Sequence, residues 1–182
     1  LIEQALFCQS IVSRINSQDI SDKLGGLGDA FGSALTAEVD QEITEAAANA
    51  VTVCFAGRND GVAEELTLKT NEIMRKKSDF LEGTYALHGY EDVLGADDVM
   101  ILVNPFESEL EKYRERIAES IGTKVIAIAE EDTIFPTIRI SGAGDFTNYV
   151  YMAAGWNLLV QAGIGLGVNI DKPERARKVG NE

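Results

Sequence analysis

The sequence has little histidine, cysteine or tryptophan, and its basic side chains are far outnumbered by acidic ones. A single histidine excludes a multi-histidine metal site within one chain. The chain has 16 lysines and arginines and 30 aspartates and glutamates, which gives a formal net charge of −14. Nucleic acids and anionic membrane surfaces both attract proteins through clusters of lysine and arginine. We therefore expect neither a nucleic acid nor a membrane as a partner.

The two cysteines, Cys8 and Cys54, both lie in apolar surroundings, one on a helical stripe and one in a strand pattern. Isolated cysteines of this kind are more typical of buried thiols in a reducing compartment than of a disulfide. We therefore expect two buried thiols and a cytoplasmic location. No basic region followed by an apolar run indicates a signal peptide. Because the first residue is Leu1 and not methionine, we expect a processed protein or an excised domain.

One stretch of the chain, residues 149–168, carries no charge and is about as long as a transmembrane helix. It also contains Asn157, Gln161 and four glycines, three of them near its end. Glycines weaken a helix, and polar amides are poorly suited to a lipid environment. We predict a buried core helix that ends in a glycine-rich loop.

Short apolar segments alternate with helical patterns along the chain. The predicted strands cover residues 50–56, 99–103, 124–129 and 137–140, and the predicted helices cover 1–17, 29–48, 62–77, 107–121 and the apolar stretch above. Strands that are apolar throughout are typical of a parallel sheet covered on both faces. We predict an α/β fold: a three-layer α/β/α domain with four or five parallel strands, flavodoxin-like or Rossmann-like, preceded by N-terminal helices.

The same pattern divides the chain into three parts. We predict a helical N-terminal segment at 1–48, an α/β domain at 49–170 and a C-terminal tail at 171–182. Ligands of parallel sheets bind beyond the carboxyl ends of the strands. The loops there are predicted at 57–61, 104–108, 130–133 and 141–145, and they contain no P-loop, no GxGxxG motif and no serine-rich phosphate cradle.

A polar stripe follows the first predicted strand. Its members are Glu65, Lys69, Glu72 and Lys76, at the spacing i, i+4, i+7 and i+11 that places them on one helical face. A solvated surface with glutamate–lysine pairs explains this stripe in the simplest way. The alternative is a carboxylate that acts as a base, with a lysine that tunes it.

Two further groups can carry chemistry. His88, in a predicted loop, is the only side chain here that titrates near neutrality without perturbation, so it is either an exposed residue or a proton donor. The tail contains Lys178, whose amine can form a Schiff base with a keto sugar if the tail is mobile. Otherwise the tail is a solvated C-terminus.

Four segments in their order and spacing resemble one family: FAGRND at 55–60, ELTLKTNEI at 65–73, LHG at 87–89 and NIDKPERARKV at 169–179. They are similar to the second sugar isomerase (SIS) domain of two-domain phosphosugar enzymes, above all to the isomerase half of glutamine–fructose-6-phosphate amidotransferases. The resemblance extends from about residue 30 to the end of the chain. It departs from the family pattern at Glu174, where the family has an arginine directly after the proline.

The resemblance implies a role for each matching residue. Glu72 would be the base that moves a proton between C1 and C2 of an open-chain sugar, and His88 would assist ring opening. Lys178 would form an imine with the keto sugar or hold its carbonyl. Glu65 and Lys69 would frame the site and tune Glu72. In that family the histidine reaches the site from the neighbouring subunit.

The resemblance also implies partners and leaves the reaction open. We expect a homodimer, an upstream SIS domain that holds the phosphate, and no cofactor or metal. The reaction is either isomerisation of a ketose or aldose phosphate with amine transfer, with fructose 6-phosphate as substrate, or the action of a fructosamine-phosphate deglycase or a glucosamine-6-phosphate deaminase, with a glycated amine phosphate as one substrate. A third possibility is a non-catalytic SIS module that binds a phosphosugar and regulates a partner.

Overall fold

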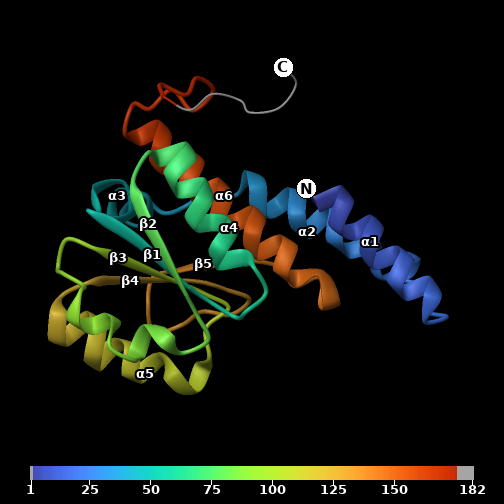
Figure 1. Cartoon of the computed structure of the whole chain (residues 1–182), viewed down its shortest axis with the longest axis horizontal. Helices are drawn as coiled ribbons and strands as arrows, with labels where there is room; N and C mark the ends of the chain where they lie inside the picture. Colours follow the sequence, from blue (N-terminus) through green and yellow to red (C-terminus); the bar gives the residue numbers. More distant parts are fainter. Residues whose placement is uncertain (1, 176–182) are drawn as a thin grey trace.

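The computed structural model describes residues 2–175 and has a parallel sheet at its centre (Figure 1). The five strands are β1 (Thr52–Gly57), β2 (Lys77–Glu82), β3 (Val99–Val103), β4 (Lys124–Ala129) and β5 (Thr137–Arg139). Their order across the sheet is β2-β1-β3-β4-β5, and every neighbouring pair is parallel. After β1 the chain forms β2 on one side of it and then crosses to form β3 on the other side. The position between β1 and β3 is therefore the topological switch point of the sheet.

Helices cover both faces of the sheet. They are α1 (Ile2–Ile15), α2 (Gly25–Thr36), α3 (Gln41–Asn49), α4 (Val62–Lys69), α5 (Leu110–Tyr113) and α6 (Thr147–Gly165), with π-helical turns at Thr70–Met74 and Arg114–Glu119 and short 3-10 turns at Ser21–Lys23, Tyr85–Leu87, Tyr90–Asp92, Glu107–Glu109 and Gly144–Phe146. α2, α3, α4 and α6 lie on one face, and α5 with its π-helical turn lies on the other. The predicted three-layer α/β/α architecture is confirmed.

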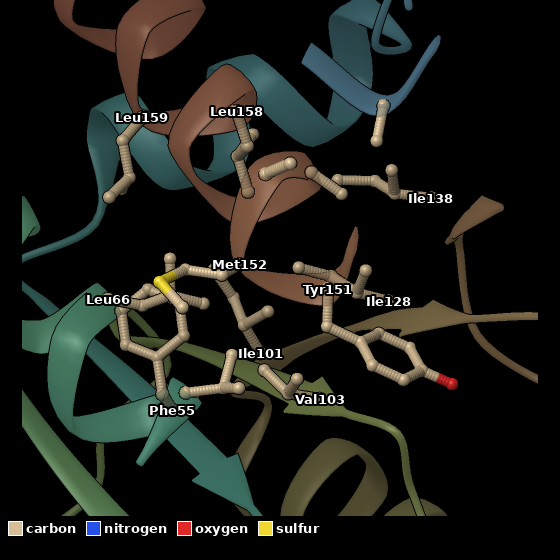
Figure 2. Packing of buried hydrophobic residues seen from close by; sticks show 14 of the residues in the cluster. Phe55, Leu66, Ile101, Val103, Ile128, Ile138, Tyr151, Met152, Leu158 and Leu159 are labelled. Carbon is tan, nitrogen blue, oxygen red and sulfur yellow. The ribbon is translucent and has the colours of Figure 1, made fainter. Parts of the chain in front are cut away.

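Alternate residues of the central strands pack against the two helical layers. Phe55, Ile101 and Ile128 point towards α6 and are fully buried, as Figure 2 shows for the cluster around Met152. Their neighbours along the strands, such as Met100, belong to a second cluster under α5. Burial on both sides explains why these strands are apolar at every position.

α6 is the core helix that the uncharged stretch predicted, and 12 of its 19 residues are buried. It packs against α2, α3 and α4, which lie around it in the same layer. Asn157, one of its polar residues, donates to the carbonyl oxygens of Ala34 and Ala37 at 3.1 and 2.7 Å, so its amide is satisfied inside the protein. Within the described part of the chain, no helix combines the length and the apolar character that crossing a membrane requires.

The sequence pattern missed one strand. Residues 62–77 were predicted as one helix, but α4 ends at Lys69, a π-helical turn follows, and Arg75 adopts a left-handed conformation with φ 57° before β2 begins at Lys77. β2 lies at the edge of the sheet, and three of its six residues are exposed. Edge strands carry charged residues that discourage pairing with other chains, so β2 lacks the apolar run of the central strands.

Two other predictions for the N-terminal part were wrong in detail. The helix predicted at 29–48 is two helices, because residues 37–40 form an extended link between α2 and α3. Cys8 was predicted to be buried but is exposed, since α1 contributes no buried residue. Cys54 is buried as expected, and both cysteines are free. The division of the chain at 48 and 170 stays a prediction.

Candidate functional site

The polar stripe is partly preserved in the structure. Lys69 Nζ lies 2.7 Å from Glu72 Oε2 and 3.8 Å from Glu65 Oε1, so these three residues come together at the end of α4. Lys76 leaves the stripe, because the π-helical turn rotates it away, and its Nζ donates to the carbonyl oxygen of Ala50 at 2.7 Å. The stripe is therefore a cluster of one lysine between two carboxylates.

The two carboxylates of this cluster have different surroundings. The Glu72 side chain is 54% exposed, whereas the Glu65 side chain is 17% exposed. Within the described residues, the buried Glu65 Oε1 has no hydrogen-bond partner, and the ammonium group of Lys69 is its nearest compensating charge. A buried carboxylate oxygen without a donor is costly, so the lysine is needed there for structural reasons. Glu72 is the most exposed member of the cluster.

Glu72 opens on a groove of about 1000 Å³ at the amino-terminal edge of the sheet. One wall is formed by Asn71, Glu72 and residues 75–77, and the other by residues 170–171 and 173–175. In Figure 1 the C-terminal segment lies beside the end of α6 and the turn that follows α4. The structure thus brings Glu72 and the C-terminal segment together. Lys178, the predicted amine, lies outside the described residues.

His88 lies at the opposite edge of the sheet. It is exposed, follows the turn Tyr85–Leu87, and its Nε2 lies 3.4 Å from Thr84 Oγ1. Glu72 comes before β2 and His88 comes after it, so the six residues of β2 separate them by about 20 Å along the strand direction. A single chain does not bring these two residues together.

The loop that carries His88 is anchored by a contact between the buried Cys54 and the half-buried Tyr90, which the sequence did not indicate. Tyr90 Oη and Cys54 Sγ lie 2.9 Å apart, and Tyr90 Oη is 3.5 Å from Asp79 Oδ2. Burial raises the pKa of the Cys54 thiol to about 11 and raises the pKa of the Tyr90 hydroxyl well above its usual range. Both groups are therefore neutral near pH 7, and their contact fixes the loop to β1.

The switch point between β1 and β3 is occupied by Arg58. Its guanidinium donates to the carbonyl oxygens of Asn104 and Pro105 and stacks on the Phe106 ring at 3.6 Å. The adjoining crevice of about 660 Å³ is lined by carboxylates and, among the described residues, by no basic side chain. These carboxylates are Glu107, Glu111, Glu130, Glu131 and Asp132.

An anionic ligand is disfavoured at this edge, because the crevice carries charge of the same sign. Arg139 offsets part of that charge, since it lies 3.2 Å from Glu131 and 3.6 Å from Asp132. Within residues 2–175, no three histidine, cysteine, aspartate or glutamate side chains are placed to hold a metal ion. The groove beside Glu72 is lined by basic as well as acidic side chains, so it suits an anionic ligand better than the crevice does.

Comparison with solved structures yields phosphosugar-processing proteins. The C-terminal domain of glucosamine-fructose-6-phosphate aminotransferase from Francisella tularensis matches with a TM-score of 0.65 and 20% identity, over 83% of this chain and 46% of that one. Glucosamine-6-phosphate deaminase from Thermotoga maritima matches with 0.66 and 18%, over 92% and 52%. Tagatose-6-phosphate ketose/aldose isomerase from Escherichia coli matches with 0.62 and 18%, over 84% and 48%.

These matches are matches of structure. No family model and no curated protein sequence matches the chain. The chain spans about half the length of the three solved structures named above. At identities of 18 to 20%, the likeness concerns the arrangement of the backbone. The shared arrangement is the parallel sheet with its two helical layers. The chain has the fold of the SIS-type phosphosugar isomerase domains.

Proposed function

We propose that this chain is the C-terminal SIS domain of a phosphosugar-processing enzyme that interconverts ketose and aldose phosphates with amine transfer, in the manner of a glucosamine-6-phosphate synthase. One observation carries the proposal. Glu72, paired with Lys69 at 2.7 Å, opens on a groove whose opposite wall is the C-terminal segment. That segment continues towards Lys178.

The chemistry assigned to this groove is proton transfer next to a carbonyl. Glu72 removes a proton from one of the carbons C1 and C2 of the open-chain sugar and returns it to the other. The ion pair with Lys69 orients its carboxylate. The Lys178 amine condenses with the keto group to form an imine, the carbonyl oxygen leaves as water, and the C–H next to the imine is more acidic. In the sequence, Lys178 comes three positions after Arg175 of the groove wall, a separation of at most about 10 Å in an extended chain.

The positions of Arg58 and His88 support two proposed partners. The phosphate is assigned to an upstream SIS domain, since Arg58 is engaged by main-chain carbonyls and the crevice beside it is acidic. A second copy of the chain is needed for ring opening, since His88 lies at the other edge of the sheet from Glu72. We propose a homodimer in which each site uses Glu72 of one subunit and the His88 side chain of the other.

A second candidate is a deglycase or deaminase, which releases an amine from the sugar instead of adding one. The observation in its favour is the match to the Thermotoga maritima deaminase, which covers 92% of this chain. Both candidates use the same proton transfer at Glu72. They are separated by substrate, because a deglycase acts on a glycated amine phosphate and a synthase-like enzyme requires fructose 6-phosphate and an amine donor.

The test is proton exchange at the sugar carbon. The natural polypeptide, in its full length, is incubated with fructose 6-phosphate in D₂O, and loss of the C1 proton is followed by NMR. We expect Glu72→Gln to slow this exchange by about 10²–10⁴-fold, the usual contribution of a general base. Glu64→Gln, which removes an exposed carboxylate from the same helix, is the matched control and should keep the wild-type rate. An unchanged rate in Glu72→Gln contradicts the proposal.

A further inference from the structure

Arg75 makes a set of contacts that the proposed chemistry does not account for. It follows the π-helical turn that carries Glu72, and its backbone is left-handed, with φ 57°. Non-glycine residues adopt this conformation infrequently. Here it ends the turn and directs the Arg75 side chain to the C-terminal segment, on the same side as the Glu72 groove.

The guanidinium of Arg75 binds the backbone of the C-terminal segment. Nη2 donates to the carbonyl oxygen of Asn169 at 3.0 Å and to that of Lys172 at 2.7 Å, and Nη1 forms an ion pair with Glu174. One terminal nitrogen, Nη2, donates to both main-chain carbonyls, and the other, Nη1, meets the Glu174 carboxylate, so the planar fork of arginine holds three acceptors in a geometry that the single ammonium of lysine does not reproduce. The contact therefore fixes the path of this segment and depends little on its side chains.

Other contacts of the segment are few. Residues 171–175 are all exposed, so no burial in the core holds them. Ile170 approaches Ile73 over Gly163, where an added side-chain carbon would lie 3.3 to 3.4 Å from both isoleucines. The ion pair with Glu174, whose side chain is 71% exposed, contributes little because solvent screens it. Asp171 N donates to Asn169 Oδ1 and Lys172 N donates to the Asn169 carbonyl, but both bonds lie within the segment. Among the described residues, the two carbonyl bonds from Arg75 are the hydrogen bonds that connect residues 169–172 to the rest of the protein.

We propose that Arg75 is a positioning residue, which holds the C-terminal segment as the second wall of the Glu72 groove so that the segment can take part in the reaction there. This inference rests on the proposed function. Arg75 itself touches no reacting atom in this scheme, and it acts through the backbone that it binds.

The test compares three substitutions in the full-length natural polypeptide. Arg75→Met keeps the aliphatic stem and removes all donors, Arg75→Lys keeps one charge, and Glu174→Gln removes only the ion pair. All three leave the left-handed position occupied by a non-glycine residue, so backbone strain is matched. Amide hydrogen exchange of residues 168–172 is the readout of the contact, and proton exchange on fructose 6-phosphate is the readout of the reaction.

We expect Arg75→Met to speed amide exchange at 168–172 by roughly tenfold or more, with β1 and β3 unchanged. The same variant should lower kcat by roughly tenfold or more with little change in KM, because the segment is misplaced and the groove is intact. Arg75→Lys should recover part of both effects, and Glu174→Gln, which removes only the solvent-screened ion pair, should leave amide exchange at 168–172 close to the wild-type rate.

Two results overturn the inference. Unchanged amide exchange in Arg75→Met shows that the contact does not hold the segment. Faster amide exchange with an unchanged kcat shows that the segment is held but has no part in the reaction. Failure of the proposed function is recognised separately, because then Glu72→Gln keeps its rate whatever Arg75 does.

Discussion

At the scale of single residues, burial changes the chemistry of groups that the sequence presents as ordinary. Tyr113, 2% exposed in the cluster under α5, has a pKa of about 12, raised first by burial and then by the charges of Glu109 and Glu91. Its pKa in the unfolded chain is near 10. The unfolded state therefore loses its proton first as the pH rises, and the folded state becomes relatively less stable.

The resulting prediction concerns alkaline stability. The raised pKa of Tyr113 contributes about 2–3 kcal/mol to the free energy of unfolding. This contribution is complete below pH 10 and is lost between pH 10 and 12. Urea unfolding across this range should show that Tyr113→Phe loses about that much less stability than the wild type. Tyr85→Phe, at a site 67% exposed, should follow the wild type. If the free energy of unfolding falls equally with pH in Tyr113→Phe and wild type, the Tyr113 hydroxyl is not the source of the alkaline loss of stability.

At the scale of elements, close packing between helices α4 and α6 sets where the turn that carries Glu72 lies. Gly155 of α6 faces Leu66 of α4, and an added side-chain carbon would overlap the methyl groups of Leu66, which is fully buried. We predict that Gly155→Ala destabilises the fold by about 1–3 kcal/mol through overpacking. Gly165→Ala, at an open position at the end of the same helix, should be neutral or stabilise by up to about 1 kcal/mol.

Thermal unfolding of both variants checks this pair. For a chain of this length, each kcal/mol shifts Tm by about 2–4 °C. Gly155→Ala should therefore lower Tm, and Gly165→Ala should leave Tm unchanged or raise it. If Gly155→Ala unfolds at the wild-type temperature, the helices are less tightly packed than the contact with Leu66 implies.

The burial of each strand determined whether the strand could be predicted from the sequence. The central strands β1, β3 and β4 are buried on both faces, so they have continuous apolar runs that can be recognised locally. β2 pairs only with β1 and is half exposed, so its pattern is not distinctive. The stripe Glu65, Lys69 and Glu72 could be predicted from helical spacing, but the left-handed turn at Arg75 depends on contacts with a segment almost 100 positions away.

At the scale of the whole molecule, the strand that the sequence pattern missed, β2, determines how far apart Glu72 and His88 lie. The resemblance to the SIS family implies that the histidine reaches the site from the neighbouring subunit. With β2 between them, Glu72 and His88 lie at opposite edges of the sheet. A parallel sheet places the residue before a strand and the residue after it a full strand length apart. The proposed site uses both residues, which is why we propose that it is assembled from two copies of the chain.

Mixing two inactive variants tests this assembly. Glu72→Gln and His88→Gln are each expected to lose proton exchange on fructose 6-phosphate. After subunits are exchanged between them, a hybrid dimer has one site with both substitutions and one site with neither. Random mixing makes half of the dimers hybrids, so activity should return to roughly a quarter of the wild-type value. If each site uses Glu72 and His88 of the same chain, every site in the mixture stays defective and no activity returns.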